Sequence, residues 1–454
     1  MDAEVCYRAA KARDARFDGL FFTAVRTTGI FCRPVCPVRT PLRRNVEFFP
    51  NAATARAAGY RPCLRCRPEV SPDSPLSAGT SATVNRALRL IHEGALDNGS
   101  TAQLAERLGL TDRHLRRLFI EHVGVPPIVV AATRRLLFAK KLITETSLRF
   151  SEIAFASGFG SLRRFNEAIR STYQRNPKDL RRFAPPGTSA ESAIELKLNY
   201  RPPYNWSAFL RFVSRRAIAG LETVSDRTYQ RDGISVSHNA SENCLLARIE
   251  PANVSRLRAV VEQIRFFFDL RANIREIAAH LRKSAMLKQL VTKNAGLRLP
   301  GCWDPFELAV RAILGQQVTV KGASTLAARL VESFGSPKPT VLADADLTSI
   351  GLTKARSESL RALSRAVADG RLRFDGSSPT PDVIAQLCEL PGVGAWTANY
   401  IAMRALGDPD AFPASDLGLL KAAGISSARR LEEMAEAWRP WRSYAALYLW
   451  ESLR

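Results

Sequence analysis

The chain has 454 residues, a formal net charge of +23 and a sequence pI of about 10.3. Hydrophobic residues make up 46% of it, enough for ordinary cores, and the length fits roughly two to four domains. The first residues contain no apolar signal segment, and no apolar run reaches about 18 residues. The composition therefore argues against a secreted or membrane-spanning protein and predicts a cytoplasmic one.

The positive charge is concentrated at the N-terminal end. Residues 1–185 hold 31 Lys/Arg against 16 Asp/Glu, a net of +15, which leaves +8 for the longer remainder. Such charge attracts a polyanion through counterion release, and the alternatives are DNA, RNA or an anionic membrane. A solvated basic face without a partner is the plainer alternative, but a whole chain at this pI favours nucleic acid.

The first 72 residues contain two closely spaced cysteine pairs. Cys32 and Cys36 have three residues between them, Cys63 and Cys66 have two, and 26 residues separate the pairs. Four thiolates with this spacing suit tetrahedral coordination of one Zn²⁺. Two disulfides are the alternative, which a reducing cytoplasm disfavours. We therefore predict one four-cysteine zinc site.

The strings RTTGIFCRPVCPVRT, NVEFF and AAGYRPCLRCRPE resemble the N-terminal domain of Ada-type methylation-response proteins across most of residues 17–69. The resemblance implies that residues 1–72 form a zinc domain in which a metal-bound thiolate accepts the methyl group of a methyl phosphotriester in DNA. It places this role on Cys32, whereas spacing alone leaves the four cysteines equal. A purely structural zinc module remains the alternative. The basic residues beside the cysteines are expected either to contact phosphate or to be solvated charge: Arg33, Arg39, Arg43 and Arg44.

Residues 71–84 predict a linker, and residues 85–183 have helical periodicity. TAQLAERLGLTDRHLRRLFIEH at 101–122 predicts a helix-turn-helix, with Thr101 and Thr111 as N-caps and Gly109 in the turn. The pattern recurs in SEIAFASGFGSLRRFNEAIRSTY at 151–173. Plain helix packing is the alternative for one copy, but two basic copies favour DNA binding. The exposed residues expected to contact DNA are Arg113, Arg116, Arg163 and Arg164.

GFGSLRRFNEAIRSTYQRNPKDLRR resembles the C-terminal signature of AraC-family regulators, over about residues 85–183. The resemblance implies sequence-specific binding to double-stranded promoter DNA and an activator role. It implies RNA polymerase as a further candidate partner and a nucleoid-associated location.

A second linker is predicted at 184–192. IELKLNY, GISVSHN and CLLARIE have the alternation of strands, a helix is expected around 206–219, and the pattern from 253 onward is helical. We therefore predict an α+β protein that is mostly helical. Its last two parts are an α+β lobe at 193–296 and an all-helical domain at 297–454.

The segment LCELPGVGAWTANYIAMRALG at 387–407 predicts two helices joined by a tight PGVG hairpin. Gly392 and Gly394 would let backbone N–H groups approach a phosphate closely. Trp396 and Tyr400 are four residues apart and share a helix face. Asp416 opens the next helix, where an ordinary N-cap is the plainer interpretation, as core packing is for the aromatic residues.

The C-terminal part resembles AlkA-type 3-methyladenine DNA glycosylases of the helix-hairpin-helix superfamily. The resemblance is carried by LPGVGAWTANY, Asp416 and WRPWRSYAALYLW, and it extends back through LRLPGCWDPFELAVRAILGQQVT to the segment from residue 200. The resemblance covers about 193–454. It implies a catalytic Asp416, a pocket for a flipped base formed by Trp396, Tyr400 and Trp450, and a hairpin that grips phosphate. Gln316 and Gln317 are expected at the DNA.

Some positions depart from these families. Trp396 stands where bifunctional relatives have a Schiff-base lysine, which implies release of the base without strand cleavage. Gln317 stands in place of an intercalating leucine, and Leu417 in place of an aromatic residue. The chain has no P-C-H-R string, so reversal of O6-methylguanine is not predicted. The alternative function is a transcriptional regulator whose C-terminal half only grips DNA.

Overall fold

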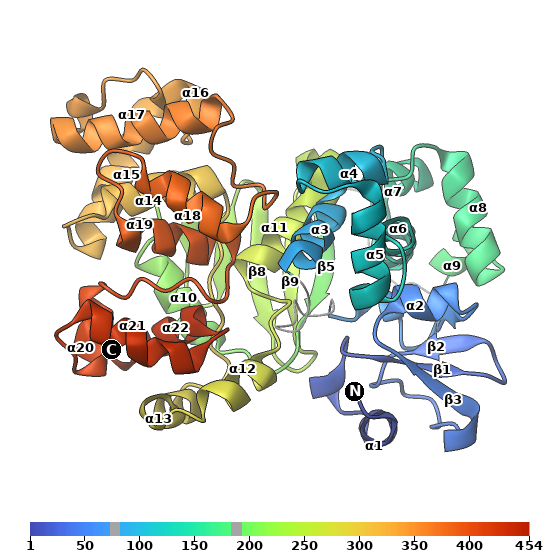
Figure 1. The fold of residues 1–454 in the computed structure, drawn as a ribbon. Helices are drawn as coiled ribbons and strands as arrows, with labels where there is room; N and C mark the ends of the chain where they lie inside the picture. The colour runs from blue at the N-terminus through green and yellow to red at the C-terminus, as the bar shows by residue number, and fades with distance from the viewer. Residues whose placement is uncertain (73–81, 183–192, 454) are drawn as a thin grey trace. The chain divides into compact units, whose positions relative to one another are not determined.

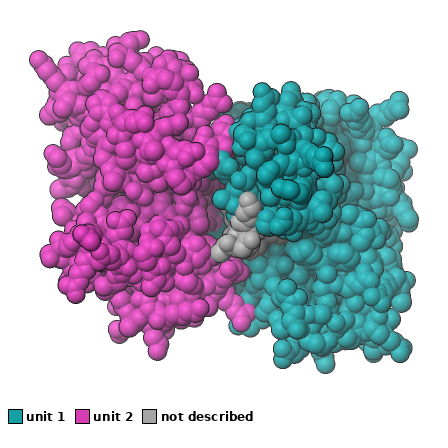
Figure 2. Space-filling model, in the orientation of Figure 1, with its two compact units in different colours: residues 1–202, 233–262, 270–272 teal, residues 203–232, 263–269, 273–454 magenta. Residues whose placement is uncertain are grey.

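The computed structural model describes residues 1–72, 82–182 and 193–453. They divide into two compact units (Figure 2), one made of residues 1–202, 233–262 and 270–272, the other of residues 203–232, 263–269 and 273–454. The predicted lobe at 193–296 is thus shared between the units. The α+β class with mostly helical content is confirmed. No helix in the described ranges combines the length and apolar character needed to cross a membrane.

The cysteine-rich block of the first unit is built on a small sheet in the order β3-β1-β2-β4. β1 runs antiparallel to β2 and β3, whereas β2 and β4 pair in parallel with Phe31 opposite Pro62. Because Cys32 ends β2 and Cys63 follows β4, this parallel pairing brings the two cysteine pairs together. The elements are α1 (Ala3–Lys11), β1 (Phe22–Val25), β2 (Ile30–Cys32), β3 (Val46–Phe49), α2 (Ala52–Ala57) and β4 (Arg61–Pro62).

Seven helices follow, and they contain the two predicted helix-turn-helix pairs. The pairs are α4–α5 and α7–α8, and the long α6 packs against α5, α7 and α8 (Figure 1). The helices are α3 (Ala82–Glu93), α4 (Thr101–Arg107), α5 (Asp112–Val123), α6 (Pro127–Glu145), α7 (Phe150–Ala156), α8 (Leu162–Tyr173) and α9 (Pro177–Arg181).

The local signals explain where these helices begin. Thr111 caps α5 as predicted, accepting a hydrogen bond from His114 N at 3.3 Å. The prediction of Thr101 as a cap is wrong, because Ser100 and Gln103 form a reciprocal capping box one residue earlier. Helix α3 begins at Ala82, so the last residues of the linker predicted at 71–84 are helical. Most of that linker, and the one at 184–192, lie outside the described residues.

A buried set of charges joins the segment after Cys66 to α6. The Glu69 carboxylate lies 2.8 Å from Lys140 Nζ, with side chains 1% and 3% exposed. Arg67 Nη2 lies 2.6 Å from Glu145 Oε1, and Glu145 Oε2 lies 2.8 Å from Lys141 Nζ. The cysteine-rich block and the helical block are therefore one body in this unit.

Replacing Glu69 by glutamine is expected to lower the free energy of unfolding of this unit by about 3–5 kcal/mol, because Lys140 keeps a buried charge without its partner. Urea unfolding together with hydrogen exchange of the α6 amides measures the loss. The double variant Glu69→Gln, Lys140→Met should recover most of the stability. If the double variant were as unstable as the single one, the lost pair would not be the cause.

The first unit also holds three antiparallel strands, with β9 paired to both β5 and β8. Their burial alternates, as expected for strands with one covered face. The strands predicted from IELKLNY, GISVSHN and CLLARIE are confirmed as β5 (Ile194–Asn199), β8 (Ile234–Asn239) and β9 (Cys244–Ile249).

The second unit is a helical body with a short β-hairpin, and its apolar core surrounds α14. α10 ends before the predicted residue 219, because the chain turns to bury Ile218, whose N–H donates to Glu222 Oε1. The elements from residue 206 on are α10 (Trp206–Ser214), β6 (Glu222–Val224), β7 (Thr228–Arg231), α11 (Leu257–Phe267, shared between the units), α12 (Ile274–Leu281), α13 (Ala285–Lys293), α14 (Pro305–Leu314), α15 (Val320–Phe334), α16 (Pro339–Leu342), α17 (Lys354–Ala368), α18 (Thr380–Cys388), α19 (Ala395–Ile401), α20 (Leu417–Ala423), α21 (Ala428–Ala435) and α22 (Arg442–Ser452).

Candidate functional site

The Asp416 carboxylate is the N-cap of α20 and receives hydrogen bonds from three directions. Its Oδ1 accepts from Leu419 N at 2.9 Å, the usual capping bond. The indole Nε1 of Trp450 also donates to Oδ1 at 2.9 Å, and Nε1 of Trp396 donates to Oδ2 at 2.9 Å. The predicted cap is present, but two tryptophans from α19 and α22 converge on the same carboxylate.

The predicted aromatic residues gather beside this carboxylate. Trp396 and Tyr400 stack with ring centroids 5.5 Å apart and an interplanar angle of 8°. Trp450 meets Tyr400 edge to face, at 6.3 Å and 62°. All three rings are partly exposed. Three π faces and one carboxylate thus share a partly open site, the combination that a cationic aromatic ligand requires.

Arg404 forms a hydrogen bond with one member of the aromatic group, and it was not predicted from the sequence. It lies in the π-helical turn Ala402–Leu406 that continues α19, and its Nη1 donates to the Tyr400 hydroxyl at 2.9 Å. Its other nitrogens donate to Pro300 O and Gly301 O at 2.9 and 2.7 Å. Its position four residues after Tyr400 on the same helix was the available signal.

The guanidiniums around Tyr400 change its acidity. Burial alone would raise the pKa of Tyr400, but the charges of Arg404 and Arg216, with the Arg404 hydrogen bond, lower the pKa to about 8. The ordinary value for tyrosine is about 10. The folded state therefore loses this proton at a lower pH than the unfolded chain.

We expect one tyrosine to ionise near pH 8 in an ultraviolet titration of the folded protein, and Tyr400→Phe to remove that step. Because the unfolded chain binds more protons between about pH 8 and 10, the free energy of unfolding should gain a contribution from Tyr400 as the pH rises through that window. Tyr448 provides the control: burial raises its pKa to about 12, so it should not ionise near pH 8. An unchanged titration in Tyr400→Phe would contradict the assignment.

The predicted hairpin between α18 and α19 is present and is braced from within the unit. Gly392 has a φ of 74°, and a Cβ there would collide with Ser359 Oγ, so this position requires glycine. Gln316 Nε2 donates to Gly392 O and Thr397 Oγ1, both at 2.9 Å. The Gln316 side chain therefore holds the hairpin in place. Gly394 is exposed and precedes the first turn of α19.

Two of the residues that depart from the family pattern are exposed. Gln317 has a φ of 55°, an uncommon backbone conformation for a residue other than glycine, and lies on the surface beside exposed Val318. Leu417 follows Asp416 and is 82% exposed.

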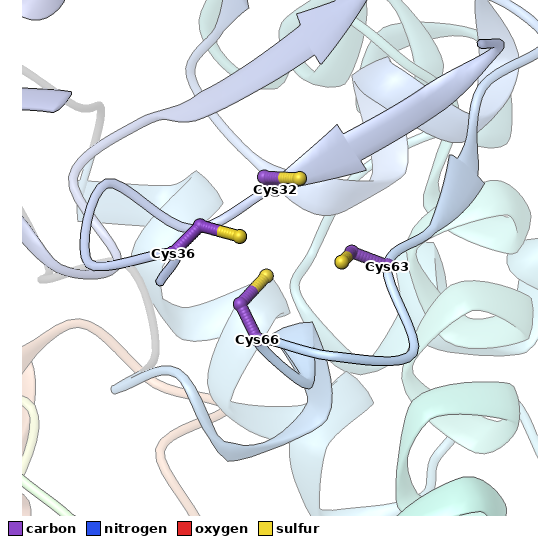
Figure 3. A group of neighbouring side chains, drawn as sticks. All are labelled: Cys32, Cys36, Cys63 and Cys66. Atoms are coloured by element: carbon purple, nitrogen blue, oxygen red, sulfur yellow. The ribbon is translucent and has the colours of Figure 1, made fainter. Parts of the chain in front are cut away.

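The four predicted cysteines meet in the first unit. Their side chains point toward a common centre (Figure 3), are buried, and have sulfur atoms that all lie within 4.8 Å of one another. Four sulfurs about 2.3 Å from one Zn²⁺ would be about 3.8 Å apart, so the donor set fits a single zinc ion. The prediction of a four-cysteine zinc site is confirmed.

One backbone hydrogen bond links the two cysteine pairs. Arg33 N, directly after Cys32, donates to Cys66 Sγ at 3.3 Å. The four sulfurs are all buried and lie close to one another, so the choice of Cys32 as methyl acceptor comes from the resemblance alone.

The arginines around the cysteines are placed unequally. Arg33 Nε donates to Asp18 Oδ1 at 2.9 Å and Nη1 to Cys66 O, with only 11% of its side chain exposed. Arg33 is thus committed to the fold around the cysteines. Arg43 pairs with Glu4 at 2.8 Å and is partly exposed, whereas Arg39 and Arg44 are exposed.

The predicted DNA-contacting arginines lie on the exposed faces of α5 and α8. On each helix the apolar residues face the core, with Leu115 and Phe119 buried in α5, and Phe165 and Ile169 in α8. A basic exposed face opposite an apolar one suits a recognition helix. The exposed residues are Arg113, Arg116, Arg163 and Arg164.

Four family models match the chain. They are the metal binding domain of Ada at residues 5–69, a helix-turn-helix domain at 104–182, the AlkA N-terminal domain at 195–304, and the HhH-GPD superfamily base excision DNA repair protein at 310–443.

Curated relatives match the whole chain and its parts. The chain is 41% identical to the "Probable bifunctional transcriptional activator/DNA repair enzyme AlkA" of Mycobacterium tuberculosis, over 100% of this chain and 97% of that one. It is 33% identical to "DNA-3-methyladenine glycosylase 2" of Escherichia coli, over 56% of this chain and 95% of that one. It is 41% identical to "Bifunctional transcriptional activator/DNA repair enzyme Ada" of Escherichia coli, over 27% of this chain and 33% of that one.

Proposed function

The chain belongs to the family of bifunctional transcriptional activator/DNA repair enzymes named AlkA, and from that premise we propose that it releases alkylated bases such as 3-methyladenine from DNA. The observation that carries this proposal is the Asp416 carboxylate placed beside the stacked rings of Trp396 and Tyr400. A module that only grips phosphate needs the hairpin but has no use for a carboxylate, which repels phosphate.

The chemistry follows from this arrangement. A damaged nucleotide flipped out of the duplex would stack its base on the rings, and a base alkylated at a ring nitrogen is a cation that π faces attract. The C1′–N bond breaks with its electron pair going to the base, and the sugar becomes oxocarbenium-like. The Asp416 charge stabilises that cation. Water then bonds to C1′ and loses a proton, which leaves an abasic site.

Trp396 bears on the type of glycosylase. The position has no amine, so the chain has no nucleophile there that could form a Schiff base with the sugar. We therefore propose a monofunctional enzyme. Incubation with duplex DNA methylated at purine ring nitrogens should yield free 3-methyladenine and intact strands with abasic sites. Tight binding without release would instead leave the C-terminal half as a module that grips DNA.

The N-terminal block is proposed to sense methyl phosphotriesters through Cys32. Its sulfur would form a bond to the methyl carbon while the methyl carbon–oxygen bond breaks, and the oxygen would leave with the electron pair as an ordinary phosphodiester. A zinc ion held by Cys32, Cys36, Cys63 and Cys66 would keep the thiolates ionised. Support comes from the Ada-type family model over residues 5–69 and from the four converging sulfurs.

Methyl transfer can be located directly. After incubation with methyl phosphotriester DNA, mass spectrometry of the wild-type chain should find one added methyl group on the peptide that contains Cys32. Cys388→Ser, which removes an exposed cysteine far from the other four in sequence, should accept the methyl group normally. A methyl group on Cys36, Cys63 or Cys66 would contradict the assignment, and no transfer at all would leave a structural zinc module.

DNA is the partner of the helix-turn-helix pairs, and we propose that it is promoter DNA bound in the major groove by α5 and α8. The proposal includes recruitment of RNA polymerase and a cytoplasmic location on the nucleoid. Replacing Arg163 and Arg164 by alanine should weaken promoter binding and reduce its salt dependence.

A further inference from the structure

The hydrogen bonds to Asp416 nearly fill its acceptor positions. A carboxylate offers about four lone-pair positions, two on each oxygen. Oδ1 accepts from Leu419 N and Trp450 Nε1, and Oδ2 accepts from Trp396 Nε1, each at 2.9 Å. One position, on Oδ2, is left for a substrate or water.

The three donors come from three different helices, so together they fix the carboxylate in position and rotation. Leu419 lies in α20 itself, Trp396 in α19 and Trp450 in α22, and α20 packs against α22. A carboxylate held by one bond can turn about its Cβ–Cγ bond. A carboxylate held through both oxygens cannot do so without breaking a bond.

Gly418 shows how closely this contact is packed. A Cβ at that position would lie 3.0 Å from Asp416 Oδ1, 3.4 Å from Trp450 Cδ1 and 3.5 Å from Trp450 Nε1. An alanine methyl group there would make ordinary contact with the Trp450 ring but would push the Asp416 carboxylate by a few tenths of an ångström. Such a shift acts directly on the hydrogen bond between Asp416 and Trp450.

We propose that Trp396 and Trp450 are positioning residues for base release, acting through their indole N–H groups on Asp416 in addition to any contact their rings make with the base. The inference rests on the proposed glycosylase function. The N–H groups hold the carboxylate so that one acceptor position of Oδ2 remains open. Loss of the Trp396 bond leaves Oδ2 unheld, and loss of the Trp450 bond leaves Oδ1 held only by the cap of its own helix. Either change loosens the carboxylate, and small misplacements of reacting groups cost up to about 10²-fold in rate.

The test deletes the N–H groups while keeping aromatic faces. In the full chain, Trp450→Phe and Trp396→Phe should each lower the single-turnover rate of 3-methyladenine release by about 10-fold to 10²-fold. Affinity for DNA containing an abasic-site analogue should change by less than about 3-fold, since an aromatic face remains. Gly418→Ala, which deletes no donor, should also lower the rate.

The matched control is Trp438→Phe. Trp438 is buried, and its Nε1 donates to Ser284 Oγ at 3.2 Å, so the same chemical deletion occurs away from Asp416. It should release base at the wild-type rate. Thermal unfolding of every variant identifies losses that come from unfolding, and Gly418→Ala keeps the test decisive if a phenylalanine variant does not fold.

The outcomes separate the inference from its premise. Normal release rates in both phenylalanine variants and in Gly418→Ala would overturn the positioning role and leave the glycosylase intact. A fall in affinity with an unchanged rate would also overturn it, because the indoles would then serve only as faces for the base. Absence of release by the wild-type chain would overturn the proposed function, and this inference with it.

Discussion

Replacing Asp416 by asparagine should lower the rate of base release by about 10²-fold to 10³-fold, the usual cost of removing one preorganised electrostatic group from an active site. Asparagine keeps the size of the side chain and is itself a good N-cap, so α20 should still begin at Leu417. What disappears is the negative charge beside the sugar. Release from methylated duplex DNA under single-turnover conditions measures the effect.

The same substitution has a second expected effect, on stability. An amide has one oxygen and one NH₂ group, so either Trp396 or Trp450 must point its indole N–H at another donor. A donor left without an acceptor costs about 1–3 kcal/mol, which should appear as a lower melting temperature of the second unit. Asp344→Asn, at a carboxylate of the same unit that is 87% exposed, is the control. Wild-type release by Asp416→Asn would show that the carboxylate is not catalytic.

Removing zinc should unfold the cysteine-rich block, because its four buried sulfurs have little apolar core around them. Structural zinc contributes about 10–16 kcal/mol in zinc-finger peptides at neutral pH. The block has only small apolar clusters, such as Phe22, Ala24, Phe31 and Ala55. Chelation, or Cys63→Ser, should therefore abolish hydrogen-exchange protection of β1 and β2.

The effect should spread to α6 and stop before the second unit. Arg67 and Glu69 follow Cys66 and pair with α6, so α6 amides should exchange faster after chelation. Base release should persist, because the carboxylate and rings lie in the other unit. Cys388→Ser gives the matched cysteine control. Undiminished protection of β1 and β2 without metal would show that the block does not need zinc to fold.

Local sequence patterns were sufficient to predict the helices and strands, but not the contacts between segments that are distant in sequence. The helix-turn-helix pairs follow from apolar periodicity and from caps such as Thr111, and the strands follow from alternation. The burial of Arg33 against Asp18 could not be predicted, because a basic residue beside a cysteine has the same pattern whether it is exposed or paired. The division of residues 193–296 between two units depends on contacts distant in sequence.

The resemblance named the residues of the candidate site, but it did not predict how they are arranged. Asp416, Trp396 and Trp450 follow from the resemblance to glycosylases, which assigns the tryptophans as base faces. Their bonds to Asp416 span 20 and 34 residues and depend on how α19 and α22 pack. Arg404 was missed because two of its three acceptors, Pro300 O and Gly301 O, lie more than 100 residues away in sequence and become neighbours only in the folded chain.

The long helix α6 ties the cysteine block to the two helix-turn-helix pairs. Its 19 residues make a rod about 28 Å long, and both α5 and α8 pack against it. Arg67 and Glu69 pair with the same helix, so the cysteine block and the recognition helices move as one body. Under the proposed sensing and promoter-binding roles, a protein docked on its operator would hold Cys32 at a set offset from the bound site and would reach only one or a few phosphates.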